Sequence, residues 1–438
     1  MYSNNTKKNI INIITLGCPK NIYDSEILMG QLKNENQIVL HEDKCNNFYD
    51  IVIINTCGFI ENAKKESIKT ILECIKKKKS GFIKKLFIMG CFSERYKFIL
   101  KKEIPEIDEY FGSNNLKLIL KKIGSFYKKE LIGERVLTTP NHFGYLKISD
   151  GCNRKCSFCA IPLMRGKYKS KSIDLLIYEA TKLAKLGVKE LILIAQDITN
   201  YGLDIYKKKS LGFLLKSLVK IEGIKWIRLH YAFPSNFPEE VLDIMANEKK
   251  ICKYLDIPFQ HISDSVLKSM RRGITKNQIN LLIEKIRKKI PDIALRTTLI
   301  VGYPKEKEKY FEELKIWVKE IRFDRLGCFI YSHEENTKAF LLKDKITKKV
   351  KKERMLEIMK IQRKISFELN KKKIGNNILC IIDRKYGKKF IGRTIFDSPD
   401  IDNQIFILNN TNKQIHVGDI IYVNITSALE YDLIGKII

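Results

Sequence analysis

Apolar residues occur in short runs along the first hundred residues, and amphipathic stretches separate these runs. The runs INIITL, DIVIINT and KLFIMG predict β-strands, and the segments near 22–34 and 60–78 predict helices. Strands that alternate with helices form parallel sheets whose faces the helices cover. Residues 9–125 are therefore predicted to be an α/β domain with a parallel sheet.

A longer series of the same kind begins near Tyr145. Its strand-like runs are YLKISDGC, ELILIAQD, WIRLHYA, YLDIPFQ, ALRTTLIVG and RLGCFIYS. Helical segments near 173–186, 211–221, 239–248, 264–271, 277–289 and 308–320 lie between or beside them. Six βα units predict a partial or open TIM-type barrel, whose catalytic residues lie where the strands end. We assign this central domain to residues 138–370.

The C-terminal part of the chain follows a different pattern. Residues 338–373 are highly charged, with apolar residues three or four positions apart, which predicts a connecting helix. Five short strand-like runs then follow between turn residues: ILCIID, FIGRTIF, QIFIL, DIIYVNIT and YDLIGKII. We predict that residues 371–438 form a small antiparallel, OB-like β-barrel and that the whole chain is of the α/β class.

Length and composition indicate a globular protein of two or three domains. The chain has 438 residues, 44% of them hydrophobic and 30% charged, and single cores seldom exceed roughly 300 residues. No apolar run approaches the ~18 residues of a membrane span. The N-terminus also lacks the pattern of an export signal. We therefore expect a cytoplasmic protein without a membrane partner.

The net charge of +31 would ordinarily suggest binding to nucleic acid. Lysines are spread along the whole chain, however, in runs such as KKKK at 76–79, so solvated lysine faces are the preferred interpretation. Residues 378–438 depart from this bias, because they contain seven Lys or Arg and seven Asp or Glu.

Three cysteines each follow a predicted N-terminal strand, namely Cys18, Cys57 and Cys91. The carboxyl ends of parallel strands share one edge of a sheet, so these thiols are expected to converge there as metal ligands. The alternative is three ordinary buried cysteines. The remaining five outside the motif described next are expected to be small buried apolar residues: Cys45, Cys74, Cys252, Cys328 and Cys380.

The most specific motif is the CxxxCxxC loop of Cys152, Cys156 and Cys159, with Phe158 before its last cysteine. Three thiolates can bind three irons of a cubane cluster and leave the fourth iron open to a non-protein ligand. A zinc site would need a fourth ligand, and no second CxxC pair follows downstream. The spacing therefore favours an iron-sulfur cluster over zinc.

This loop resembles the cluster-binding loop of the radical S-adenosylmethionine superfamily. The resemblance implies that the open iron binds S-adenosylmethionine and that reductive cleavage of this cofactor yields a 5′-deoxyadenosyl radical. Candidate cofactor contacts are Phe158, Gln196 with its neighbour Asp197, Arg296 and Gly302. Ordinary polar residues at strand ends are the alternative for the polar candidates.

The three upstream cysteines extend the resemblance to the methylthiotransferases and over the whole chain. In that family an N-terminal domain binds an auxiliary 4Fe-4S cluster, the barrel performs radical chemistry, and a C-terminal TRAM domain recognises the substrate. The resemblance implies two 4Fe-4S clusters, with S-adenosylmethionine as both methyl donor and radical source. It also implies an electron donor and a sulfur donor, and we assign no acid-base catalyst.

Six motifs favour one branch of this family: GCPKNIYDSE, MGCFSERY, AQDITNYG, HYAFP, YLDIPFQH and GRTIFDSPDID. They are similar to the enzymes that modify the β-carbon of an aspartate in the twelfth small-subunit ribosomal protein. The other branch modifies adenosine in tRNA and typically has Gln-Met-Asn where this chain has Pro19, Lys20 and Asn21. The clearest departure is His333, where a small residue or proline is usual.

The neutral C-terminal segment points to the same choice of substrate. A domain that grips tRNA should be basic, whereas one that meets a basic ribosomal protein gains from acidic residues. Asp397, Asp400 and Asp402 are the predicted contact cluster, and a turn rich in Asp and Pro is the alternative. A tRNA substrate is thus disfavoured, and a non-enzymatic iron-sulfur protein that binds RNA is a further alternative.

Overall fold

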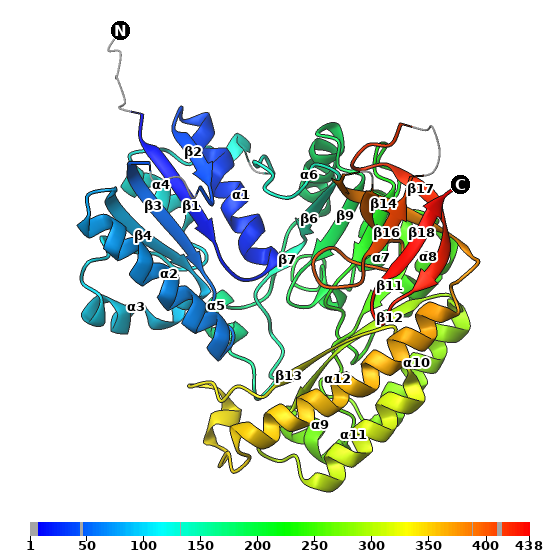
Figure 1. The fold of residues 1–438 in the computed structure, drawn as a ribbon. Helices are drawn as coiled ribbons and strands as arrows, with labels where there is room; N and C mark the ends of the chain where they lie inside the picture. Colours follow the sequence, from blue (N-terminus) through cyan, green and yellow to red (C-terminus); the bar gives the residue numbers. More distant parts are fainter. Residues whose placement is uncertain (1–7, 44–46, 132, 388, 410–413) are drawn as a thin grey trace. The chain divides into compact units, whose positions relative to one another are not determined.

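The computed structural model describes residues 8–43, 47–131, 133–387, 389–409 and 414–438. The chain divides into two compact units. The first comprises Met1–Thr139, Tyr145–Asn153 and Ala160–Lys182, and the second comprises Pro140–Gly144, Arg154–Cys159 and Leu183–Ile438. Figure 1 shows the order of the helices and strands along the chain. No helix within the described ranges is long and apolar enough to cross a bilayer.

The first unit contains the predicted parallel sheet, with its five strands in the order β2-β1-β3-β4-β5. The strands are β1 (Ile10–Thr15), β2 (Ile38–His41), β3 (Tyr49–Thr56), β4 (Ile83–Gly90) and β5 (Glu109–Tyr110). The helices are α1 (Pro19–Asn34), α2 (Glu61–Lys79), α3 (Cys91–Glu103) and α4 (Leu116–Ile123). The three predicted strands are confirmed. The two edge strands, β2 and β5, are additional.

Two apolar clusters cover the two faces of this sheet, because successive strand residues point to opposite sides. On one face, Ile53 and Phe87 pack with Leu28 of α1 and Ile119 of α4. On the other face, the side chains of β3 and β4 pack with those of α2 and α3: Val52, Ile54, Leu86, Ile88, Ile71, Ile75 and Leu100. The helices therefore cover both faces of the sheet, as the alternating pattern predicts.

The first unit continues beyond the sheet in shorter elements. These include a 3₁₀ turn (Lys129–Leu131), the strands β7 (Ser149–Asp150) and β8 (Lys169–Ser170), and the helix α5 (Ile161–Arg165). Helix α6 (Ile173–Lys185) begins in this unit. Helix α5 was not predicted, because five residues are too few to show a helical period. Pro162 in its first turn favours a helix start.

The second unit is built on an open sheet whose order, β13-β12-β11-β10-β9-β6, follows the chain. Its strands are β9 (Glu190–Ile194), β10 (Trp226–Leu229), β11 (Ile251–Asp256), β12 (Ala294–Val301), β13 (Arg325–Ile330) and β6 (Phe143–Lys147), of which Phe143 and Gly144 belong to this unit and the last three residues to the first. Intervening helices are α7 (Leu211–Leu218), α8 (Glu239–Asn247), α9 (Asp264–Met270), α10 (Lys276–Lys289) and α11 (Glu308–Ile321). Short 3₁₀ turns lie at Ile198–Asn200 and Lys338–Leu341. The six predicted βα units are confirmed as a partial barrel.

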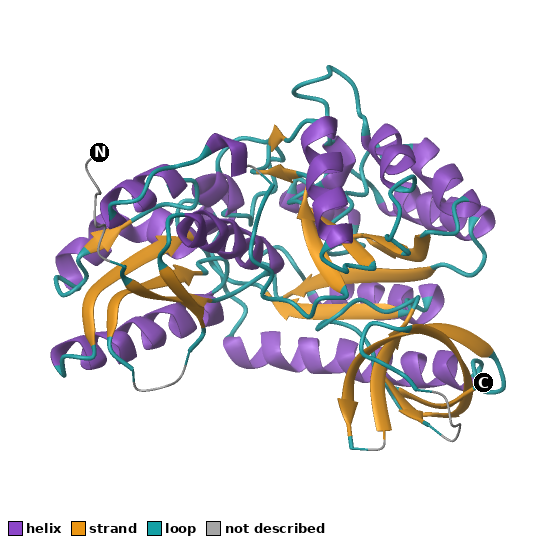
Figure 2. Ribbon diagram, turned by 90° about the horizontal axis from the view of Figure 1, so that it is seen from above, coloured by secondary structure: helices purple, strands orange, loops and turns teal. Residues whose placement is uncertain are grey.

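Helix α12 (Lys348–Lys371) connects this sheet to a closed C-terminal barrel. The barrel strands are β14 (Asn377–Tyr386), β15 (Lys389–Thr394), β16 (Ile405–Leu408), β17 (Ile420–Ala428) and β18 (Leu433–Ile437). In Figure 2 these strands curl into a ring beside the end of α12. Asn370 of α12 donates to the carbonyl of Tyr431, 3.0 Å away.

One pairing in this barrel corrects the expected all-antiparallel arrangement. Four neighbouring pairs are antiparallel, but β16 and β18 are parallel. Strand direction must alternate around an antiparallel ring, and a closed ring of five strands cannot alternate throughout. At least one parallel pair therefore follows from the five strands themselves.

The C-terminal barrel packs against the strand starts of the open sheet. Ile381 of β14 lies in one apolar cluster with Trp226 of β10, Tyr254 of β11 and Ala294 of β12. Buried ion pairs continue this interface. Arg393 of β15 lies 2.8 Å from Glu190 of β9, and Glu190 lies 2.7 Å from Arg228 of β10. Arg393 also pairs with Asp383 at 2.8 Å.

Two of the three aspartates predicted to contact a substrate are part of this interface, so that prediction is wrong for them. Asp397 is buried and accepts from Arg325 of β13 at 2.8 Å. The side chain of Asp402 is 1% exposed and accepts from Tyr254 at 2.7 Å and from Arg296 at 3.3 Å. Only Asp400 of the three is exposed. Burying a carboxylate costs free energy because it loses its hydration, so buried aspartates need partners that replace the lost water.

We predict that Arg393→Ala destabilises the second unit by about 3 to 5 kcal/mol, because it leaves Glu190 buried beside Arg228 alone. The control is Arg384→Ala on the neighbouring strand β14, where the arginine is exposed and donates to Gln404 at 3.2 Å. Surface changes of this kind cost about 0.5 kcal/mol or less. Chemical denaturation followed by circular dichroism measures the free energy of unfolding of both variants. Equal decreases in the two variants would contradict a stabilising role for the buried ion pairs of Arg393.

Candidate functional site

The three N-terminal cysteines stand at one edge of the first unit's sheet. Cys18 is the residue before α1, Cys57 directly follows β3, and Cys91 is the first residue of α3, directly after β4. The registers of the parallel strands bring these ends level, because Thr15 pairs with Asn55 and Thr56 pairs with Gly90. The predicted convergence of the three strand ends is confirmed.

Two glycines with positive φ allow the three turns to approach one another. At Gly17 (φ +95°) an added Cβ would lie 2.6 Å from the Cβ of Cys57. At Gly90 (φ +97°) it would lie 2.4 Å from Oδ1 of Asn55 and 2.5 Å from the carbonyl oxygen of Thr56. Glycine alone combines this backbone conformation with so close an approach. Each of these glycines directly precedes a cysteine of the triad, Cys18 or Cys91.

Amide and hydroxyl side chains fix the loops between the cysteines. Nδ2 of Asn21 donates to the carbonyls of Leu16 (2.7 Å) and Thr56 (3.2 Å). Ser67 of α2 accepts from the backbone N–H of Cys57 at 3.1 Å and donates to its carbonyl at 2.9 Å. These bonds hold the backbone of the cysteine turns independently of any metal.

Burial governs the protonation of these thiols. It raises the pKa of Cys57 to about 12, and the nearby Cys18 adds to the effect. Burial also raises the pKa of Cys91, with the charge of Arg165 acting in the opposite direction. Cysteine binds metal as thiolate, so metal binding at this triad displaces protons from the buried thiols.

The chemistry of this triad suits an iron-sulfur cluster. No three His, Cys, Asp or Glu side chains in the described part of the chain are grouped tightly enough for a single metal ion. Three thiolates of a cubane bind three different irons and so are spread more widely than the ligands of one ion. Three soft thiol ligands, without imidazole or carboxylate, are the donor set that clusters use.

One guanidinium in the first unit contacts the triad directly, and it was not predicted from the sequence. Arg165 of α5 donates from Nε to Sγ of Cys91 at 3.2 Å. Its other nitrogens reach Asn21 at 2.6 Å, Asp24 at 2.5 Å and Asp150 at 3.3 Å. An arginine inside a charged and apolar segment such as IPLMRGK gives no sequence signal for such a role.

The CxxxCxxC loop has one part in each unit. Cys152 belongs to the first unit, where its N–H donates to the carbonyl of Gly166 at 3.1 Å. Cys156 and Cys159 belong to the second unit. There Ser157 anchors the loop, since its N–H donates to Met270 at 3.0 Å and its hydroxyl donates to Ser269 at 2.8 Å, both at the end of α9.

Phe158, a predicted cofactor contact, packs in an apolar cluster of the second unit. The cluster consists of Val266, Met270, Tyr303, Tyr331 and Ala339 with partly buried neighbours. The aromatic residue before the last cysteine is therefore partly buried, and it fixes the loop to α9 and to the end of β12.

Two arginines flank an aromatic ring beside the second-unit cysteines. The guanidinium carbons of Arg154 and Arg272 lie 3.9 Å and 4.2 Å from the ring centre of Phe233. Arg154 also donates to buried Asp197 at 2.8 Å, and Arg272 donates to Sγ of Cys156 at 3.3 Å. Sequence reasoning predicted Asp197 but missed both arginines and the ring, because their proximity depends on three separate loops.

The other predicted cofactor contacts occupy two different levels of the second unit's sheet. Gln196 lies two residues beyond β9, and Gly302 (φ +75°) directly follows β12, so both are at the strand-end edge where barrel active sites form. Arg296, however, is the third residue of β12 and pairs with Asp256 (3.1 Å) and Asp402 (3.3 Å). It faces the C-terminal barrel.

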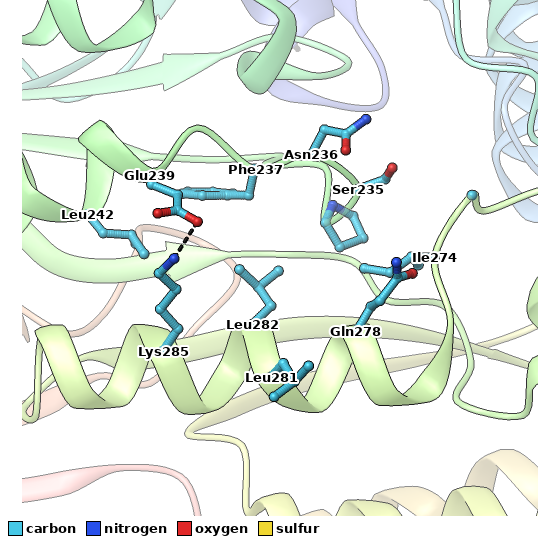
Figure 3. A pocket seen from close by; sticks show the side chains of 12 residues that line it. Ser235, Asn236, Phe237, Glu239, Leu242, Ile274, Gln278, Leu281, Leu282 and Lys285 are labelled. Atoms are coloured by element: carbon cyan, nitrogen blue, oxygen red, sulfur yellow. Dashed lines mark ion pairs between the residues drawn. The ribbon is translucent and has the colours of Figure 1, made fainter.

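A cavity of about 320 Å³ lies between the loop after β10 and helix α10 (Figure 3). Phe237 and Leu282 line it, and Glu239 forms an ion pair with Lys285 at its side. None of the predicted cluster or cofactor residues lines this cavity.

Four of the five remaining cysteines are buried as predicted: Cys74, Cys252, Cys328 and Cys380. Cys45 lies outside the described residues.

Three family profiles match the chain. They are the Radical SAM superfamily over residues 146–318, the Uncharacterized protein family UPF0004 over residues 10–112 and the TRAM domain over residues 374–438. Together they follow the three parts that the hydrophobic pattern separates.

Curated relatives match the chain over its full length. It is 58% identical to the ribosomal protein uS12 methylthiotransferase RimO of Christiangramia forsetii, with 100% of this chain and 96% of the relative covered. The proteins of the same name from Flavobacterium psychrophilum and Cytophaga hutchinsonii are 57% and 52% identical, each with 100% of both chains covered.

Solved structures share the fold at low sequence identity. The radical S-adenosylmethionine methyltransferase TsrM from Kitasatospora setae has a TM-score of 0.57 at 14% identity, with 73% of each chain covered. The cobalamin-dependent S-adenosylmethionine radical enzyme OxsB has a TM-score of 0.51 at 14% identity, with 80% of this chain and 56% of that chain covered.

We predict that Gly90→Ala lowers the iron bound by the Cys18, Cys57 and Cys91 triad, because its Cβ would displace the turn that carries Cys91. The measurement is iron per chain after anaerobic reconstitution, in protein whose Cys152, Cys156 and Cys159 are replaced by Ala. The control is Gly81→Ala, where φ is +80° but nothing lies within 4 Å of the added Cβ. Equal iron in both variants would show that the close packing at Gly90 is irrelevant to metal binding.

Proposed function

We propose that this chain, which belongs to the RimO family of ribosomal protein uS12 methylthiotransferases, attaches a methylthio group to the β-carbon of an aspartate in uS12. The observation that carries the proposal is the convergence of Cys18, Cys57 and Cys91 at one sheet edge, in a chain that also has the CxxxCxxC loop. Sulfur insertion at an unactivated C–H bond needs both a radical source and a sulfur source. Two cysteine triads match these two needs.

The proposed metal ligands are the six cysteines of the two triads. Cys18, Cys57 and Cys91 would hold the auxiliary 4Fe-4S cluster, and Cys152, Cys156 and Cys159 would hold the cluster that binds S-adenosylmethionine. The second set is confined by its own sequence, because only three and two residues separate its cysteines. When bound, the two clusters and S-adenosylmethionine supply the hydrogen-abstracting radical, the sulfur and the methyl group.

The protein's own residues position these groups and exclude water. Ser157 and Phe158 fix the CxxxCxxC loop to α9 and so hold the backbone that carries Cys156 and Cys159. The N–H of Gly302 donates to Glu306 at 3.0 Å, which fixes the turn after β12. We retain Phe158, Gln196 and Gly302 as cofactor contacts by their positions in the second unit.

Arg296 also remains a proposed cofactor contact, but its ion pairs set a condition. Asp256 and Asp402 already satisfy its guanidinium, so it would have to share these carboxylates with the carboxylate of S-adenosylmethionine. No acid-base catalyst is proposed, since hydrogen abstraction by a radical needs none.

The proposed domains are residues 9–125, 138–370 and 371–438. The last of these, the TRAM domain, would meet the substrate through surfaces other than Asp397 and Asp402, which pair with Arg325 and Arg296. The choice of uS12 over tRNA therefore rests on the family and not on an acidic patch. The reaction also needs an electron donor and a sulfur donor, and we place it in the cytoplasm, where ribosomal proteins are made.

The test is anaerobic incubation of the reconstituted protein with S-adenosylmethionine, a reductant and sulfide, with uS12 and unmodified tRNA offered separately. Mass spectrometry should show a methylthio increment on an aspartate-containing peptide of uS12. Cys57→Ser should reduce this product to background while cleavage of S-adenosylmethionine to 5′-deoxyadenosine continues, because only the auxiliary triad is broken.

The matched control is Cys74→Ser, since Cys74 is a buried cysteine of α2 in the same unit but outside both triads. It should retain the product. An increment on adenosine instead of aspartate would overturn the substrate assignment, and equal product in both serine variants would overturn the role of the triad.

A further inference from the structure

Arg165 lies at the centre of a buried group of charges in the first unit. It is 3% exposed, and its nitrogens contact Asp24 and Asp150. Lys147 is also buried and pairs with the same two carboxylates, at 2.5 Å and 2.9 Å. Two cations thus face two anions, so the group is electrically balanced.

The surroundings of Arg165 and Asp150 favour their charged forms. Burial acts against the charge of Arg165, but Asp24, Cys91 and Asp150 raise its pKa well above the ordinary value. Burial likewise acts against the charge of Asp150, but Lys147 and Arg165 lower its pKa. The guanidinium is therefore a permanent donor at this position.

The contact with Cys91 distinguishes Arg165 from an ordinary structural arginine. All three nitrogens of its guanidinium are occupied: Nη1 by the carboxylates, Nη2 by Asn21, and Nε by Sγ of Cys91 at 3.2 Å. The partners on both sides of the guanidinium fix its plane. Nε is consequently held toward the sulfur with little freedom to turn away.

Hydrogen bonds to cysteine sulfur and nearby charges are among the factors that set the reduction potential of an iron-sulfur cluster. A donor and a positive charge stabilise the reduced form, because reduction adds negative charge. A neighbouring carboxylate has the opposite effect. Arg165 and Asp24 therefore act in opposite directions on any cluster that Cys91 binds.

We propose that Arg165 is a positioning residue of the auxiliary cluster, which fixes Sγ of Cys91 and raises the cluster's reduction potential, while Asp24 limits this increase. The inference rests on the proposed function only in assigning a cluster to Cys18, Cys57 and Cys91. It does not depend on which substrate is modified.

The test uses the full chain with Cys152, Cys156 and Cys159 replaced by Ala, so that only the auxiliary cluster is present. The midpoint potential is measured by electron paramagnetic resonance during an anaerobic titration with a chemical reductant. Arg165→Gln should shift the midpoint to more negative potential, Asp24→Asn should shift it to more positive potential, and Arg165→Lys should stay closer to the parent than Arg165→Gln does.

The control is Lys171→Gln, which removes a partly buried cation of the first unit. Lys171 donates to Glu179 at 2.9 Å and to Tyr23. Its loss should leave the midpoint unchanged. If Arg165→Gln does not retain its cluster, the midpoint potential of Asp24→Asn is still measured. A shift of that midpoint to more positive potential is the expected result.

Shifts of one sign in Arg165→Gln and Asp24→Asn, or shifts no larger than that of Lys171→Gln, would overturn the proposal. If the parent with an intact triad binds no cluster, the failure belongs to the proposed function instead. A missing cluster in the parent and missing shifts in the variants are separate results of the same titration. The failure of the proposed function and the failure of this inference can therefore be told apart.

Discussion

The cysteine site depends on the close approach of three turns at the carboxyl edge of one parallel sheet. Gly17 and Gly90 leave no room for a Cβ, and they directly precede Cys18 and Cys91. The parallel registers place the ends of β1, β3 and β4 at the same height in the sheet, and the two glycines then allow the turns after these strands to approach closely. The positions of the thiols are thus a property of the folded backbone, which α1, α2, α3 and α4 support from both faces of the sheet.

Buried charge is the second organising feature, and each unit uses it differently. In the first unit Arg165 and Lys147 are balanced by Asp24 and Asp150, and the surplus donor of Arg165 meets a thiol. In the second unit arginines of the open sheet and the C-terminal barrel meet carboxylates across their interface. Because an unpaired buried charge is costly, such pairs fix which side chains face one another.

The hydrophobic pattern predicted most of the fold because long runs and amphipathic helices carry strong local signals. It missed β2, β5, β7, β8 and α5, which are too short to show a period, and it also left α3 and α4 unassigned. Strand ends predicted the triad of Cys18, Cys57 and Cys91, since chain order and parallel pairing are enough for that step, and the CxxxCxxC spacing predicted the other triad. The sequence pattern could not predict contacts between distant segments, such as that of Arg165 with Cys91. Asp397 and Asp402 were likewise predicted to lie at the surface, but they are bound to Arg325 and Tyr254 in the interior. A turn rich in Asp looks the same whether solvent or an arginine faces it.

The central claim is that two separate cysteine triads each bind one cubane cluster. The most direct measurement is iron and sulfide per chain, with Mössbauer spectra, for the parent and for two variants in which all three cysteines of one triad are replaced by Ala. We predict ~8 irons in the parent and ~4 in each variant, all in 4Fe-4S form. Loss of all iron from either variant, or no loss from one of them, would contradict the claim.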